Sequence, residues 1–247
     1  MAYKGFAHVY DQLMAHAPYD KWVAFTEHMI TQSNKKISTI LDLGCGTGEI
    51  AIRLAKQGYT ITGVDYASDM LTHAMAKSTQ EQVPISWIQQ DIIHLHGFSN
   101  IDLCISYCDV MNYITNKNDI ENVCQRVYDS LKADGLFIFD IHHIKYANEQ
   151  LIDHTFAEES DDLAYIWECE QGDERGEMYH YLTFFQRQHN HYIRFDEVHH
   201  QRTYEMEEYE LILKKCGFTK IKFYADFNAE KGNSLDHAER IFILAQK

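Results

Sequence analysis

The sequence lacks the features that mark membrane, secreted and nucleic-acid-binding proteins. No apolar run approaches the roughly 18 residues that a membrane helix needs, so we expect no membrane partner. The first residues, Met1 to Gly5, lack the charged-then-apolar pattern of a secretion signal, which predicts a cytoplasmic protein. Basic residues cluster only in pairs and the formal net charge is −15, so we expect no basic face for nucleic-acid phosphates.

The cysteines and histidines also lack the spacing of a disulfide frame or a metal site. The six cysteines contain no C-x-x-C pair and are interpreted as reduced, mostly buried thiols. The 15 histidines include neighbours such as His142-His143, and solvated surface positions account for most of them, so no metal is predicted. At 247 residues and 45% hydrophobic composition, the chain can bury one large core domain with an insertion.

A buried strand that runs into a glycine-rich turn lies at the centre of the predicted fold. Residues 40–48 read Ile-Leu-Asp-Leu-Gly-Cys-Gly-Thr-Gly, and a helix is predicted over 49–57. Strand, glycine turn and helix form the cofactor corner of a doubly wound α/β sheet, because glycine lets the backbone approach a ligand. Asp65 ends the next strand, where a carboxylate can accept hydrogen bonds from both hydroxyls of a ribose. A turn that serves only tight packing is the alternative interpretation.

The glycine spacing and Asp42 favour a nucleoside without a phosphate. The glycines run G-x-G-x-G, whereas dinucleotide binders carry G-x-G-x-x-G. Asp42 stands two residues before Gly44, and its carboxylate would repel a pyrophosphate at the helix amino terminus. S-adenosylmethionine has no phosphate and carries an ammonium and a sulfonium with which acids can pair. We therefore predict S-adenosylmethionine as the cofactor, with an NAD-dependent oxidoreductase as an alternative.

Two runs of residues carry a resemblance to a known family. The run Leu41-Asp42-Leu43-Gly44-Cys45-Gly46-Thr47-Gly48 resembles the first motif of the class I S-adenosylmethionine-dependent methyltransferases. The run Phe6-Ala7-x-x-Tyr10-Asp11-x-Leu13-Met14 resembles the amino-terminal segment of small bacterial members that act on small molecules. In those relatives the segment lies over the cofactor as a lid, which implies that Tyr10, Tyr19 and Trp22 lie near the ligand.

The resemblance also implies an α/β fold with a doubly wound, mostly parallel, Rossmann-like sheet of seven strands. A chain that ends in strand, loop and strand suits a hairpin that closes such a sheet. Residues from Thr155 to Tyr204 alternate with a period of two and predict an inserted antiparallel β sheet over the strand ends. The predicted units are a helical lid at 1–35, a cofactor-binding core at 36–145 and 204–247, and a β cap at 146–203.

Further cofactor contacts are predicted where strands end. Asp91 follows the third predicted strand, and a carboxylate at that strand end can reach an adenine amino group. The resembling family has an acid followed by an apolar residue at this point, and Asp91 and Ile92 match that pair. An aspartate that only caps the loop is the alternative. The predicted cofactor-binding residues are Tyr10, Asp42, Gly44, Cys45, Gly46, Asp65, Tyr66, Met70, Asp91, Ile92 and Tyr107.

The segment Tyr107 to Tyr113 follows the fourth predicted strand and resembles the family's fourth motif, whose residues flank the transferring methyl group. Methyl transfer chiefly needs in-line alignment, and it needs a base only if the acceptor must lose a proton early. The candidate catalytic residues are Tyr107, Asp109 and His142, and the sequence leaves open which of them is the base.

These features together predict a methyltransferase with a small-molecule acceptor that is methylated at oxygen, nitrogen or carbon. The acidic composition and the inserted sheet disfavour a nucleic-acid acceptor, while a protein acceptor stays open. A non-catalytic S-adenosylmethionine-binding regulatory module is an alternative from another class. The inserted sheet also leaves a homodimer surface or a plain cover open.

Overall fold

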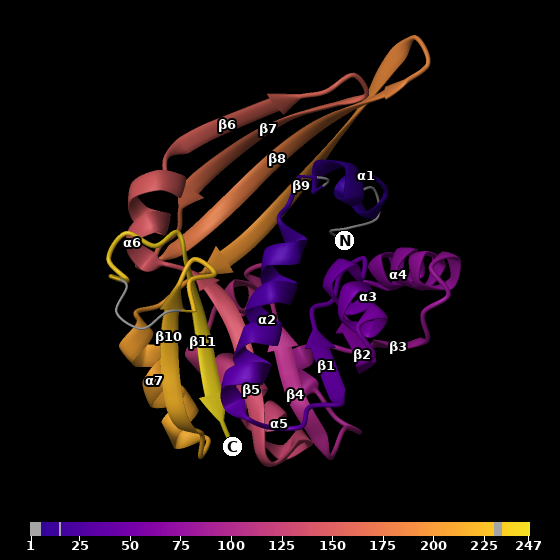
Figure 1. The fold of residues 1–247 in the computed structure, drawn as a ribbon. Coiled ribbons are helices and arrows are strands. Elements are labelled where there is room, and N and C mark those ends of the chain that lie inside the picture. Colours follow the sequence, from indigo (N-terminus) through magenta and orange to yellow (C-terminus); the bar gives the residue numbers. More distant parts are fainter. Residues whose placement is uncertain (1–5, 15, 230–233) are drawn as a thin grey trace.

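The central sheet contains seven strands in the order β10-β11-β5-β4-β1-β2-β3 (Figure 1). The structure is a computed structural model that describes residues 6–14, 16–229 and 234–247, with side chains from residue 10 onward. The strands of this sheet are β1 (Thr39–Leu43), β2 (Thr60–Asp65), β3 (Ile85–Gln89), β4 (Ile101–Ser106), β5 (Leu131–His142), β10 (Thr219–Ala225) and β11 (Arg240–Gln246).

The helices lie on both faces of the sheet and at its carboxyl edge. The α-helices are α1 (Phe6–Leu13), α2 (Tyr19–Ser33), α3 (Glu49–Lys56), α4 (Ser68–Gln80), α5 (Lys117–Ser130), α6 (Ile144–Tyr146) and α7 (Met206–Lys215). Shorter turns are η1 (Ile92–His94), η2 (Val110–Tyr113) and η3 (Ala147–Leu151). None of the described helices combines the length and apolar character needed to cross a membrane.

Strand β1 lies in the middle of the sheet and runs parallel to β2 on one side and β4 on the other. Parallel strands that are covered on both faces need apolar side chains on both, which explains the apolar run that precedes the glycine turn. Ile40 packs towards α2 and α3, whereas Leu41 and Leu43 pack towards α5 and α7. Only β11 is antiparallel to its core neighbours, β5 and β10. The prediction of a mostly parallel, seven-stranded α/β sheet is confirmed.

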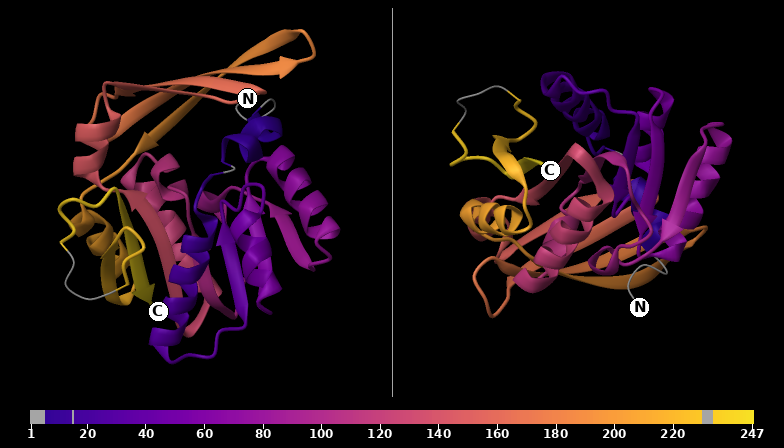
Figure 2. Two further views of the ribbon diagram at one scale, coloured as in Figure 1. Left: turned by 45° about the horizontal axis from the view of Figure 1, so that its top comes forward. Right: turned by 90° about the horizontal axis from the view of Figure 1, so that it is seen from below.

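A second, antiparallel sheet lies across the carboxyl ends of the central strands (Figures 1 and 2). Its strands, in spatial order, are β6 (His154–Glu159), β7 (Leu163–Gln171), β8 (Glu177–Gln188) and β9 (His191–Arg202). The chain enters this sheet after β5 and returns beside the same point, where the Thr203 hydroxyl donates a hydrogen bond to the His142 carbonyl at 2.6 Å. The predicted inserted antiparallel sheet is confirmed and has four strands.

A small apolar cluster joins helix α1, the start of α4 and the second sheet. Met70 and Phe184 are its buried centre, and Tyr10 and Leu13 of α1 pack against them. Figure 1 shows α1 between the second sheet and α4. Because three separately positioned elements share this cluster, α1 closes one side of the space above the central strands.

Candidate active site

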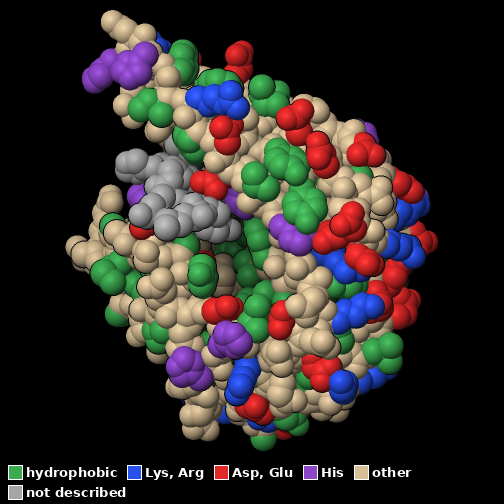
Figure 3. Space-filling view, turned by 180° about the vertical axis from the view of Figure 1, so that it is seen from behind, with side chains coloured by type: hydrophobic (Ala, Val, Ile, Leu, Met, Phe, Trp, Pro, Cys, Tyr) green, Lys and Arg blue, Asp and Glu red, His purple; other side chains and the backbone are tan. Residues whose placement is uncertain are grey.

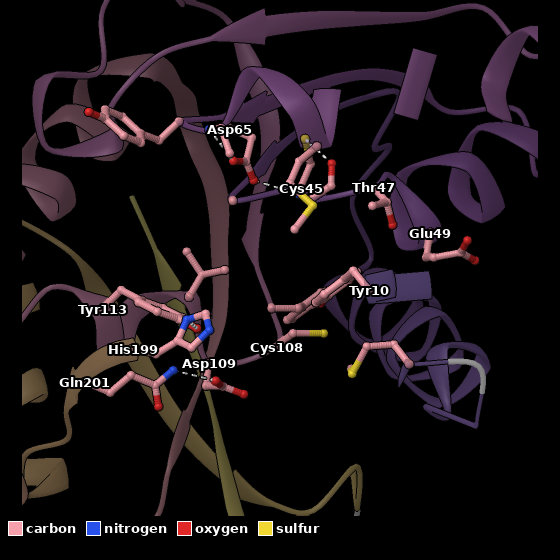
Figure 4. A pocket seen from close by; sticks show the side chains of 18 of the residues that line it. Tyr10, Cys45, Thr47, Glu49, Asp65, Cys108, Asp109, Tyr113, His199 and Gln201 are labelled. Atoms are coloured by element: carbon pink, nitrogen blue, oxygen red, sulfur yellow. Dashed lines mark hydrogen bonds between the residues drawn. The ribbon is translucent and has the colours of Figure 1, made fainter. Parts of the chain in front are cut away.

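A cavity of about 710 Å³ lies between the carboxyl ends of the central strands, α1 and the second sheet. All eleven residues named above as cofactor-binding, and the three catalytic candidates, line it, whereas Trp22 does not. Figure 4 shows that Asp65 and Cys45 lie at one end of this cavity, and that Asp109, Tyr113, His199 and Gln201 lie at the other. The volume is within the range of roughly 300–1,000 Å³ that small-molecule and cofactor sites occupy.

The glycine turn after β1 forms the floor of the first end. The N–H groups of Gly44 and Cys45 both donate to the Val64 carbonyl, at 2.8 and 3.0 Å, which folds the turn back onto β2. Gly44 has φ +73°, and a Cβ there would lie 2.4 Å from Val110. A side chain would therefore strain the backbone and push η2 away from the turn, so the sequence needs glycine at this position.

Asp65 is held rigidly beside the turn at the end of β2. One carboxylate oxygen accepts the Gly46 N–H at 2.8 Å, and the other accepts the Ala67 N–H at 2.8 Å. Burial raises the pKa of Asp65 although these backbone bonds oppose the rise. The carboxylate still has lone pairs that face the cavity, which is the arrangement required to accept hydrogen bonds from ligand hydroxyls.

Asp42 adds a second carboxyl group to the same wall. It lies on β1, is 4% exposed and lines the cavity. Burial and, secondarily, the charge of Asp65 raise the pKa of Asp42 from 3.8 to about 7. A positively charged group of a ligand beside Asp42 would favour the ionised carboxylate and lower its pKa again. Two carboxyl groups with a tight glycine turn fit a cationic nucleoside better than one that carries a diphosphate.

The remaining predicted cofactor residues lie around the rim and wall of this end. Asp91 accepts the Ile93 N–H at 2.9 Å, so it caps η1 while it also lines the cavity. Ile92 and Met70 are buried, whereas Tyr66 is 72% exposed at the mouth. The two interpretations of Asp91, loop cap and cavity contact, are thus compatible in one geometry.

Helix α1 is fastened to the glycine turn through Asp11. The Thr47 hydroxyl donates to Asp11 at 2.6 Å, and Lys77 of α4 pairs with Asp11 at 3.0 Å. Tyr10 and Tyr19 line the cavity as predicted. The prediction for Trp22 is wrong, because its ring is buried and its indole N–H donates to Asp140 at 2.6 Å instead of facing the ligand space.

Asp140, at the end of β5, shapes the loop after β4. Its carboxylate accepts the backbone N–H groups of Cys108 and Asp109, at 3.3 and 2.8 Å. Both of these residues have positive φ, 59° and 53°, and the paired N–H bonds hold this unusual conformation. The Arg240 guanidinium lies 3.2 Å from Asp140 and neutralises its charge. The result is a fixed loop that projects the Asp109 side chain into the cavity.

Several polar side chains contact Asp109 at the second end of the cavity. Its carboxylate accepts hydrogen bonds from Arg240 at 3.0 Å and from Gln201 at 2.8 Å, and the His142 Nε2 atom lies 3.6 Å away. Burial would raise the pKa of Asp109, but the neighbouring His142 and Arg240 favour the ionised carboxylate, outweigh burial and hold this pKa well below its usual range. Asp109 is therefore an anion in a largely enclosed site.

A directed chain of hydrogen bonds runs from the second sheet to Asp109. The Trp167 indole N–H donates to His180 Nδ1 at 3.0 Å, and His180 Nε2 lies 3.1 Å from the Gln201 side-chain oxygen. Because indole can only donate, His180 carries its proton on Nε2 and donates to Gln201, which in turn donates to Asp109. Burial and the neighbouring His142 lower the pKa of His180 to about 4, so this histidine is neutral.

Sequence reasoning missed most of the residues at this second end. The missed lining residues are Tyr165, Trp167, His180, Leu182, His199, Gln201 and Arg240. The period-two alternation placed His180 on one face of a strand, but only the strand pairing, which sets His180 opposite His199, shows that this face meets the cavity. The described residues contain no group of three or more His, Cys, Asp and Glu arranged to hold a metal ion.

Comparison with known proteins agrees with this geometry. A family described as "Methyltransferase domain" matches residues 40–135, which include the glycine turn, Asp65 and Asp109. YqeM from Bacillus subtilis (strain 168), which is named as a methyltransferase, is 41% identical over 248 residues that cover 100% of this chain and 98% of that protein. An S-adenosylmethionine-dependent methyltransferase from Clostridium acetobutylicum has a crystal structure that is 30% identical, with TM-score 0.88 over 99% of this chain and 98% of that one.

The chain belongs to the class I S-adenosylmethionine-dependent methyltransferases. Its cofactor is S-adenosylmethionine, so the interpretations as an NAD-dependent oxidoreductase and as a non-catalytic module are set aside. The crystal structure of DesVI from Streptomyces venezuelae, 16% identical with TM-score 0.79 over 97% of each chain, shares the fold. In this methyltransferase the acidic wall of Asp42 and Asp65 beside a tight glycine turn fits the cofactor's positive charge and its ribose.

Proposed function

We propose that this methyltransferase acts on a small-molecule acceptor that binds between Asp109 and the second sheet. The observation that carries the proposal is the shape of the cavity, in which the second sheet and α1 cover the strand ends. Among the described residues, the lining contains Asp42, Glu49, Asp65, Asp91 and Asp109 but, of lysines and arginines, only Arg240, and Arg240 is paired with two carboxylates. Such a lining disfavours a phosphate polymer as the acceptor, because phosphate contacts need free cations.

At the first end, the chain's own residues suit each part of the cofactor. We assign Asp65 to the ribose hydroxyls, Asp42 to the positively charged methionine end, and Asp91 with Ile92 to the adenine. Gly44, Cys45 and Gly46 let the backbone approach the ligand, while Tyr10, Tyr66, Met70 and Tyr107 supply walls. When bound there, S-adenosylmethionine would supply an electrophilic methyl group for transfer to the acceptor.

At the second end, His142 is our choice for the base. Asp109 lies 3.6 Å from its Nε2 atom and can stabilise the protonated ring, which is how a carboxylate supports a histidine base. Tyr107 lines the cavity, but its hydroxyl is hydrogen-bonded to Thr26 at 2.8 Å and burial raises its pKa. We therefore assign Tyr107 to the wall and Asp109 to orientation of the acceptor and of His142.

The division into units enters the proposal as well. We propose that residues 1–35 act as a lid, that 36–145 and 204–247 bind the cofactor, and that 146–203 select the acceptor. Residues 1–5, 15 and 230–233 of these units lie outside the described residues. We also propose a cytoplasmic location, which the six free thiols support. The homodimer stays a prediction. Its candidate surface is the face of the second sheet on which the exposed side chains of Ile166, Tyr181 and Val198 lie. Figure 3 shows exposed hydrophobic side chains among acidic and basic ones. Sedimentation at increasing concentration tests this prediction.

The experiment follows a labelled methyl group. The protein is incubated with methyl-labelled S-adenosylmethionine and a cell extract that has been divided by ultrafiltration into small metabolites and macromolecules. We expect label in the small-molecule fraction only, and we expect His142→Gln to remove it. Label in RNA or protein, with none in small molecules, would contradict the proposal.

A further inference from the structure

We propose that the acceptor is an amine, which Asp109 binds in its ammonium form and His142 deprotonates. This inference rests on the proposed function and adds the chemical class of the acceptor. It follows from the balance of charge around Asp109, from the hydrogen bonds that keep His180 neutral, and from the aromatic rings at the same end.

With Asp109 and Asp140 ionised and His142 neutral, the cluster around Asp109 has one negative charge in excess. Arg240 contacts Asp109 at 3.0 Å and Asp140 at 3.2 Å, so a single guanidinium serves two carboxylates. Asp140 is fully buried, whereas the Asp109 side chain is 20% exposed and lines the cavity. Asp109 is thus the carboxylate that a ligand can reach. A buried excess charge is costly unless a counter-charge arrives, so this end favours a ligand that brings a positive charge.

The second sheet brings no cation to this excess charge. His180 uses both ring nitrogens, accepting from Trp167 and donating to Gln201, and this pattern requires the neutral ring. His199 is bonded to the Tyr113 hydroxyl at 3.0 Å, and burial lowers its pKa. Gln201 contributes a neutral donor to Asp109. His142 is the remaining group of the cluster that can take up a proton, so the missing charge is either a proton on His142 or the charge of the acceptor.

Aromatic side chains line the same end of the cavity. Trp167 of β7 donates to His180, and the hydroxyl of Tyr113 in η2 is bonded to His199. Aromatic rings attract cations, an effect worth roughly 0.5–2 kcal/mol per contact depending on solvation. A hydroxyl or carboxylate gains nothing from that attraction, and a carboxylate is repelled by Asp109. The site therefore ranks an ammonium group above a hydroxyl and a hydroxyl above a carboxylate.

The reaction balances with the groups that are present. The acceptor ammonium gives one proton to His142, which becomes positively charged beside Asp109. The freed nitrogen lone pair forms the new N–C bond to the methyl carbon, and the electrons of the broken S–C bond remain on the sulfur. The product is a methylated ammonium, and His142 returns its proton to solvent when the product leaves.

The test compares three probes of matched size that differ only in their terminal group: phenethylamine, 2-phenylethanol and 3-phenylpropanoate. Each is titrated into the protein saturated with S-adenosylhomocysteine, at a pH where the amine is protonated, and binding is followed by calorimetry. We expect phenethylamine to bind at least about tenfold more tightly than 2-phenylethanol, and we expect no binding of 3-phenylpropanoate. An alcohol or carboxylate that binds as well as the amine overturns the inference, as does failure of the amine to bind.

Asp109→Asn tests the residue itself, because asparagine keeps the size of the side chain and tolerates the positive φ of this position. We expect it to reduce the advantage of the amine over the alcohol to less than about threefold. Asp161→Asn, at an exposed site outside the cavity lining, is the matched control and should leave the ranking unchanged. If Asp109→Asn does not fold, the order of affinities of the three probes for the wild-type protein still tests the inference. Failure of S-adenosylhomocysteine itself to bind would instead count against the proposed function.

Discussion

Replacing Asp42 by asparagine should stabilise the ligand-free protein at alkaline pH and weaken its binding of the cofactor. Asp42 is 4% exposed, and burial, followed by the charge of Asp65, raises its pKa from 3.8 to about 7. The folded protein therefore holds the Asp42 proton more tightly than the unfolded chain does. Ionisation of Asp42 therefore lowers the free energy of unfolding. This loss is absent below about pH 4, grows as the pH rises towards 7, and is complete above about pH 7.

The size of the stability change follows from the pKa shift of Asp42. A rise of the pKa from 3.8 to about 7 corresponds to roughly 4 kcal/mol, at 1.36 kcal/mol per unit. An asparagine amide needs acceptors for its N–H groups, which offsets about 1–3 kcal/mol of this gain. We therefore expect Asp42→Asn to raise the free energy of unfolding by roughly 1–3 kcal/mol at about pH 8 and to lose that advantage near pH 5.

The same substitution removes the charge that we assign to the cofactor's positive end. Hydrogen bonds to charged groups contribute about 1.5–3 kcal/mol, so the dissociation constant of S-adenosylhomocysteine should rise by roughly 10- to 150-fold. Urea unfolding at several pH values, with and without S-adenosylhomocysteine, measures both effects, and Asp161→Asn is the control. A stability difference between Asp42→Asn and wild type that stays constant from about pH 5 to 8 would refute the reasoning, because the charge would then not be its cause.

The remaining predictions concern three other positions. Asp65→Ala should weaken S-adenosylhomocysteine binding by about 1–3 kcal/mol in calorimetry, and unchanged affinity would remove the ribose assignment. His142→Gln should slow methyl transfer by roughly 10²- to 10⁴-fold while cofactor affinity stays within about twofold, and an unchanged rate would show that alignment alone suffices. Gly44→Ala should lower the free energy of unfolding in urea by roughly 2–4 kcal/mol, because φ is +73° and the alanine Cβ would lie 2.4 Å from Val110. A variant as stable as wild type would show that the turn can relax.

The cofactor end of the site could be predicted from the sequence because its parts are close together in the chain. Strand β1, its glycine turn and Asp65 span fewer than 30 residues, and each leaves a local signal: an apolar run, glycines at fixed spacing, and an acid at a strand end. These signals describe backbone requirements, which hold whatever the rest of the chain does.

The acceptor end could not be predicted, because distant residues create it. Gln201 reaches Asp109 across 92 positions, and Arg240 reaches it across 131. The predicted helical lid includes Trp22, but the sequence cannot show that its indole N–H donates to Asp140, a carboxylate 118 residues away. Buried polar groups must find partners somewhere, and only the assembled fold shows where.

The crystal structure of the complex with S-adenosylhomocysteine tests the central claim most directly. The account predicts that both ribose hydroxyls lie within hydrogen-bond distance of Asp65, that the sulfur faces Asp109 and His142, and that the homocysteine ammonium lies on the side of Asp42. An adenosyl group bound elsewhere, or one whose ribose makes no contact with Asp65, would contradict it.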